Sequence, residues 1–163
     1  MLVAPWLALA PLILLLADRR AAWLGWLHGT VAWLVAVPWI VPTLTTFGRL
    51  PLWLALLLWV VMCLYLGSYS LVFAWLGRRL WNRRGLLALL GLPALWVALE
   101  WLRTYLWTGF PWNLAAYAWA EMPGALPLSS WIGSYGVSFV VVLANVALAL
   151  SIASRRPRVG GGR

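Results

Sequence analysis

Charged side chains are scarce in this chain of 163 residues. They make up 9% of it, whereas about 25% is usual for a soluble domain, and 65% of the residues are hydrophobic. This composition excludes an ordinary soluble domain and indicates an integral membrane protein. Lysine is absent, so all twelve basic residues are arginine. There is one cysteine, Cys63, which excludes a disulfide within the chain.

Cys63 does not have the surroundings of a nucleophile. An active thiolate requires an exposed, electropositive site or a neighbouring base. Cys63 instead lies between Met62 and Leu64 in a long apolar run without charged residues. We therefore expect no catalytic cysteine here.

The arginines are concentrated at the ends of apolar runs. On a soluble chain, the net charge of +9 would suggest a nucleic-acid partner. We expect no such partner, because the charges do not form a stripe on a folded domain. Ten of the arginines fall into three clusters: Arg19 and Arg20; Arg78, Arg79, Arg83 and Arg84; and Arg155, Arg156, Arg158 and Arg163. Clusters of this kind orient membrane spans with arginine on the cytoplasmic side.

The apolar runs predict an all-α polytopic membrane bundle of about five transmembrane helices. The predicted spans are 1–17, 21–41, 50–77, 85–106 and 130–154. Prolines predict a loop or a short interfacial helix at 108–128, on the outer side. With the N-terminus outside and the C-terminus cytoplasmic, all three arginine clusters lie inside. We expect residues 1–154 to form one transmembrane domain, followed by a basic, glycine-rich, disordered tail at 155–163.

Most other polar and aromatic residues suit ordinary membrane packing. The fifteen tryptophans are typical of aromatic belts at the two interfaces. His28, in the second span, is interpreted as a packed and hydrogen-bonded core residue. In the fifth span a small, polar face predicts helix packing; its members are Gly133, Ser134, Gly136, Ser138 and Asn145.

Glu100 and Arg103 stand out because they place two charges on one face of an apolar helix. A charge within a span is costly and marks a candidate functional site. Two interpretations are open. The two side chains form an internal ion pair that lets the helix end near lipid headgroups. Alternatively, Arg103 binds a lipid phosphate through its planar fork, while Glu100 orients Arg103 or the following loop.

A turn follows these two charges, with the sequence Gly109-Phe110-Pro111-Trp112. The glycine and the proline allow the chain to bend, and proline also removes one backbone donor. The two aromatic side chains are stable at a membrane interface. We therefore include all four residues with Glu100 and Arg103 in a candidate lipid- or substrate-binding site.

The stretch from Ala94 through Glu100 and Arg103 to Trp112 resembles the membrane domain of bacterial apolipoprotein N-acyltransferases. Weaker similarity runs from about Pro5 to Leu150. The resemblance implies a bacterial inner-membrane location and transfer of an acyl chain from a phospholipid to the N-terminal cysteine amine of a lipoprotein. It also implies two partners, the phospholipid and the acyl chains of the lipoprotein, and no cofactor or metal ion.

The catalytic part of that family has no counterpart here. It is a nitrilase-like domain with a glutamate base, a lysine and a cysteine nucleophile. This chain has no lysine and no soluble stretch of domain size. We therefore expect no catalytic residue in this chain and no activity from it alone, and a separately encoded nitrilase-like domain is a possible partner. The alternative functions are a non-catalytic membrane module that binds lipid or a partner helix, and a small transporter.

Overall fold

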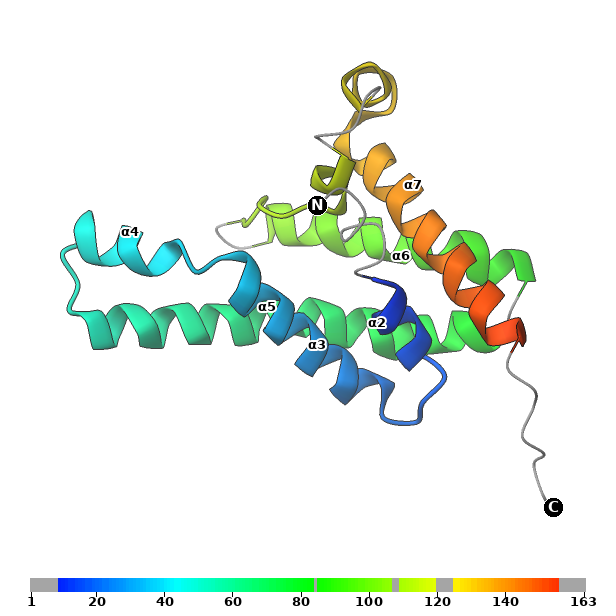
Figure 1. Ribbon diagram of the computed structural model, residues 1–163, viewed down its shortest axis with the longest axis horizontal. Helices are drawn as coiled ribbons and strands as arrows, with labels where there is room; N and C mark the ends of the chain where they lie inside the picture. Colours follow the sequence, from blue (N-terminus) through cyan, green and yellow to red (C-terminus); the bar gives the residue numbers. More distant parts are fainter. Residues whose placement is uncertain (1–8, 84, 107–108, 120–124, 156–163) are drawn as a thin grey trace.

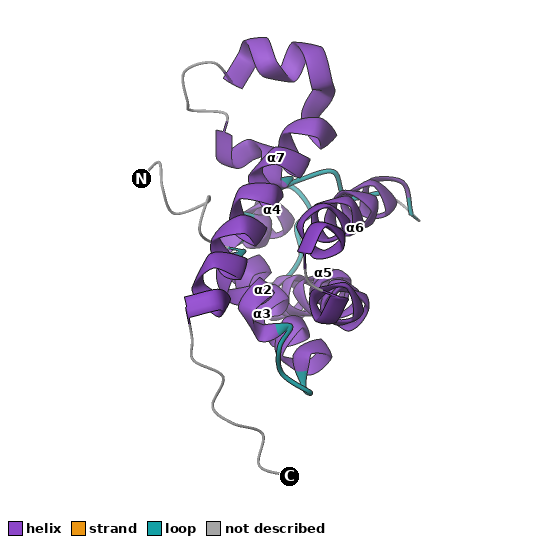
Figure 2. Cartoon of the chain, turned by 90° about the vertical axis from the view of Figure 1, so that its right-hand side faces the viewer, coloured by secondary structure: helices purple, strands orange, loops and turns teal. Residues whose placement is uncertain are grey.

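The protein is a helical bundle without β-strands in the described part of the chain (Figure 1). The computed structural model describes residues 9–83, 85–106, 109–119 and 125–155. In chain order the helices are α2 (Ala10–Leu15), α3 (Ala21–Ala36), α4 (Ile40–Thr46), α5 (Leu52–Arg83), α6 (Gly85–Tyr105), the 3-10 helix η1 (Ala115–Trp119) and α7 (Ala125–Arg155). Figure 2 shows the same helices from the side. The predicted all-α membrane fold is confirmed.

Within the described ranges, three helices are long and apolar enough to cross a membrane: α5, α6 and the Ser129–Ser154 part of α7. The pair α3 and α4, which meet at a bend of 54°, is a candidate for a fourth crossing. The predicted span 1–17 lies partly outside the described residues, and its described end contains the short helix α2. The predicted tail at 155–163 also lies outside them, apart from Arg155 at the end of α7.

The second predicted span, 21–41, is broken rather than continuous. Helix α3 ends at Ala36, and Val37 follows with φ −125° and ψ 39°. Pro38 explains the break, because a proline disfavours the helical conformation of the residue before it. Helix α4 follows, and the first part of α5 returns beside it. Together they form a long arm that extends from the bundle (Figure 1).

Helix α5 continues beyond the predicted span 50–77 and ends at Arg83. Its 32 residues correspond to about 48 Å, whereas the hydrocarbon core of a bilayer is about 30 Å thick. The helix is therefore long enough to cross the bilayer with its arginines beyond the apolar layer.

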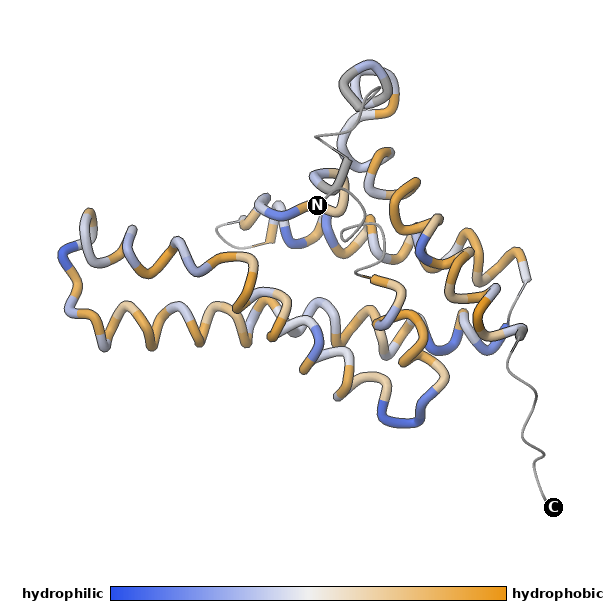
Figure 3. The backbone as a smooth tube through the Cα atoms, viewed as in Figure 1, coloured by the Kyte–Doolittle hydropathy of each residue, from blue (hydrophilic) through white to orange (hydrophobic). Residues whose placement is uncertain are grey.

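Helices α3 and α5 pack antiparallel through small residues. A side chain on Gly25 would meet Ala74, and a side chain on Gly67 would meet Thr30. This order places the start of α3, next to Arg20, at the same end of the bundle as the arginines of α5. Figure 3 shows hydrophilic segments at both positions, with hydrophobic segments along the helices between them. Arg19, Arg20 and the arginines within α5 thus lie on one side of the bundle, as the sequence predicts.

The core joins α2, α5, α6 and α7. Its fully buried members include Leu12, Leu16, Phe73, Leu92, Val142 and Val146. Ser138 and Asn145 of α7 are also fully buried, which agrees with their predicted packing role. The prediction is wrong for Gly133 and Ser134, which are exposed. Gly133 instead interrupts α7 with φ 68° and ψ 174°, a conformation that glycine adopts without a steric penalty.

Candidate functional site

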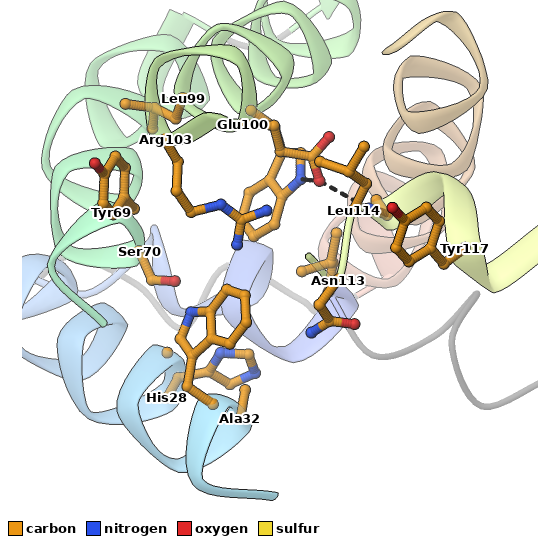
Figure 4. A pocket seen from close by; sticks show the side chains of 15 residues that line it. His28, Ala32, Tyr69, Ser70, Leu99, Glu100, Arg103, Asn113, Leu114 and Tyr117 are labelled. Atoms are coloured by element: carbon orange, nitrogen blue, oxygen red, sulfur yellow. Dashed lines mark hydrogen bonds between the residues drawn. The ribbon is translucent and has the colours of Figure 1, made fainter. Parts of the chain in front are cut away.

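The last turns of α6 direct Glu100 and Arg103 into the interior of the bundle. Only 4% of Glu100 and 6% of Arg103 is exposed. Both line a cavity of about 430 Å³, which we call the Arg103 chamber (Figure 4). Its walls include His28, Ala32 and Trp33 of α3, Tyr69 and Ser70 of α5, Leu99, Glu100 and Arg103 of α6, and Asn113, Leu114, Ala115 and Tyr117 of the segment after α6.

Arg103 is a buried cation whose neighbours satisfy it only in part. Its guanidinium carbon lies 4.7 Å from the centre of the Trp33 ring, over the ring face. This cation–π contact stabilises the charge. Nε and Nη2 are buried, however, and neither has a hydrogen-bond acceptor among the described residues. A planar fork with free N–H groups is suited to the oxygens of a phosphate or carboxylate.

Glu100 supports the loop rather than Arg103. Its Oε1 accepts hydrogen bonds from Trp96 Nε1 at 2.9 Å and from the Ala115 backbone N–H at 2.7 Å. Its Oε2 is buried without a donor in the described part of the chain. No salt bridge joins Glu100 to Arg103 among these residues, although the Glu100 charge acts electrostatically on Arg103. Both interpretations of this pair therefore stay predictions.

The Gly109-Phe110-Pro111-Trp112 turn folds back over the ends of α6 and α3. Gly109 has φ 70°, and the Phe110 N–H donates to the Arg103 carbonyl at 3.0 Å. The Phe110 ring packs edge-on against Trp33, with 5.7 Å between the ring centroids. Trp112 packs against Trp39 in the same way, with 5.6 Å between the centroids.

These four residues do not line the Arg103 chamber. Phe110 is linked to it through Trp33, whereas Pro111 and Trp112 are exposed. The structure therefore brings Glu100 and Arg103 into one cavity and places the predicted turn beside it.

Comparisons with known proteins agree with the sequence resemblance. A family model described as "Apolipoprotein N-acyltransferase N-terminal domain" matches residues 1–147. The chain belongs to the apolipoprotein N-acyltransferase family. It is 37% identical to the apolipoprotein N-acyltransferase of Geobacter metallireducens over 146 residues, which are 88% of this chain and 28% of that protein. It is 38% identical to that of Chromobacterium violaceum over 160 residues, which are 94% of this chain and 30% of the relative.

The match covers the N-terminal domain of the family and less than a third of these relatives. In this apolipoprotein N-acyltransferase domain, Cys63 is fully buried, in a cluster with Trp33 and Val37. Its burial agrees with the expectation that it is not a nucleophile.

Two residues of the chamber do not stand out in the sequence of this apolipoprotein N-acyltransferase domain. Trp33 is one tryptophan among fifteen, and its contact with Arg103 joins two helices far apart in the chain. Tyr69 lies in the chamber wall beside it. The sequence assigns His28 to a packed core, but His28 is only partly buried and also lines the chamber. The polar residues on α3 and α5 are the only sequence feature that could indicate the chamber wall. They are hard to recognise because both helices are otherwise apolar.

Proposed function

We propose that this multi-pass domain serves the N-acylation of lipoproteins in the bacterial inner membrane, with its N-terminus outside. It accommodates the phospholipid acyl donor and the acyl chains of the lipoprotein acceptor. The nitrilase-like catalytic part acts on them from the outer side. The observation that carries this proposal is the family match over residues 1–147.

Within this role, Arg103 contacts the phosphate of the phospholipid. Support comes from its burial and from two N–H-bearing nitrogens, Nε and Nη2, that lack acceptors in the described chain. A buried charge that its neighbours satisfy only in part is unfavourable, so an anionic oxygen in the chamber stabilises the domain as well as binding to it. A lipid phosphate supplies such oxygens at the interface where α6 ends.

The neighbouring residues complete the lipid site. Glu100 holds the loop wall through Ala115. Gly109 and Pro111 fix the turn, while Phe110 and Trp112 present aromatic rings at the interface. The polar chamber receives the headgroup region, and the exposed apolar faces of α5 and α6 lie against acyl chains.

A domain exchange tests this function. Residues 1–147 replace the matching segment of the Chromobacterium violaceum enzyme, and acyl transfer to a lipoprotein peptide is measured. We expect the chimera to be active and Arg103→Gln to lower its activity by roughly 10- to 100-fold, the effect of losing hydrogen bonds to a charged group. Arg49→Gln, at an exposed arginine outside the chamber, is the control. A folded but inactive chimera, or equal activity of both variants, would contradict the proposal.

A further inference from the structure

Two successive backbone N–H groups at the start of η1 are bound by side chains from two different helices. The Ala115 N–H donates to Glu100 Oε1 of α6 at 2.7 Å, and the Ala116 N–H donates to Ser138 Oγ of α7 at 3.0 Å. The first N–H groups of a helix have no acceptor within it, and side chains commonly cap them. Here the caps come from α6 and α7, whereas most helices are capped by a residue next to them in the chain.

The capped segment, 113–117, is a wall of the Arg103 chamber. Asn113, Leu114, Ala115 and Tyr117 all line the cavity. Leu114 is 7% exposed, and Asn113 is held in the left-handed region at φ 56°. The segment is thus packed against the bundle through Leu114, although it contains little regular structure of its own.

Ser138 is well placed to hold this wall. It is fully buried on α7, between Val137 and the buried Val141 and Val142. A buried hydroxyl without a partner is unfavourable, so the bond to Ala116 stabilises both groups. The bond also fixes the segment to α7, while Glu100 fixes it to α6.

We infer that Ser138 is a positioning residue for the Arg103 chamber: together with Glu100 it clamps residues 113–117 between α6 and α7 and so restricts access to Arg103. The clamp itself is independent of the ligand. Its consequence for lipid binding rests on the proposed function. Because the two caps sit on different helices, a change in the spacing of α6 and α7 opens the wall.

The test measures the reaction of Arg103 with phenylglyoxal in the purified full chain, by peptide mass spectrometry. Exposed Arg49 is the internal reference. Ser138→Ala removes the acceptor, and we expect the Arg103-to-Arg49 rate ratio to rise roughly 2- to 12-fold, the change in open population from one lost hydrogen bond. Ser151→Ala is the control, since that hydroxyl is exposed and bonds only within α7, to Ala147.

A matched pair separates the hydroxyl from packing. Ser138→Thr and Ser138→Val have nearly the same shape, but only threonine retains the acceptor. We expect the ratio to stay near the wild-type value in Ser138→Thr and to rise in Ser138→Val. The buried Cys63 reports folding, because it stays unreactive to a thiol reagent in a folded chain. If Ser138→Ala fails that check, the Thr–Val pair decides. An equal ratio in the pair overturns the inference, whatever the outcome of lipid-binding experiments.

Discussion

Glu100 uses one carboxylate oxygen for two neighbours. Its Oε1 accepts from both Trp96 and Ala115, so the hydrogen bonds matter to this corner of the bundle independently of the charge. We predict that Glu100→Ala destabilises the domain by about 1–3 kcal/mol, because two partly buried donors lose their acceptor. Glu100→Gln keeps an acceptor and should lose much less. Thermal unfolding in detergent measures the difference, and equal losses would show that the charge is the important property.

The charge of Arg103 is stabilised by a second residue, Trp33. The ring face supports a cation whose Nε and Nη2 have no hydrogen-bond acceptor among the described residues. We predict that Trp33→Leu weakens lipid retention and that Trp39→Leu, a change in a tryptophan that meets Trp112 but not Arg103, does so less. Phospholipid phosphorus per purified chain is the readout. A larger loss from Trp39→Leu would assign the effect to the turn rather than to the cation–π contact.

At the scale of elements, Gly109 begins the turn after α6 in a backbone conformation that few residues permit. Its φ of 70° is unfavourable for an L-residue, by about 1–2 kcal/mol, and a Cβ there would collide with the Thr104 carbonyl. Gly85 has a similar φ of 62°, but a Cβ at Gly85 would meet no atom within 4 Å. We predict that Gly109→Ala lowers the unfolding temperature more than Gly85→Ala does. Equal shifts would mean that the backbone conformation alone, without the collision, sets the cost.

The turns and the long helices are predictable from the sequence, whereas the chamber is not. Apolar runs bounded by arginines define α5, α6 and α7, and Gly109 with Pro111 marks the turn. The contact of Trp33 with Arg103 and the bond of Ser138 to Ala116 depend on how helices meet, which no local pattern reports. The bend after α3 comes earlier than the predicted end of the span. Pro38 and Pro42 both lie in this region, and the sequence does not show which of them breaks the helix.

For the whole molecule, the arginine distribution predicts the topology. Arg49 and Asn82 are exposed near opposite ends of α5, about 50 Å apart along the helix axis. In a Cys63→Ala background we predict that Arg49→Cys is labelled from outside and Asn82→Cys only from inside the cell. A membrane-impermeant thiol reagent makes the measurement. Labelling of Asn82→Cys from outside would reverse the orientation and place the chamber near the cytoplasmic leaflet.

The most direct test of the lipid site is phospholipid retention by the double variant Glu100→Gln, Arg103→Gln. The glutamine at position 100 keeps an acceptor for Ala115, so the loop wall should stay in place while both charges are removed. Phosphorus per chain is measured after purification in detergent, with Cys63 reactivity as the folding check and Arg103→Lys as a graded comparison. We predict that the double variant folds but loses bound phospholipid, and that Arg103→Lys keeps part of it because an ammonium lacks the planar fork. Equal phospholipid on the wild type and the folded double variant would contradict a phosphate site at Arg103.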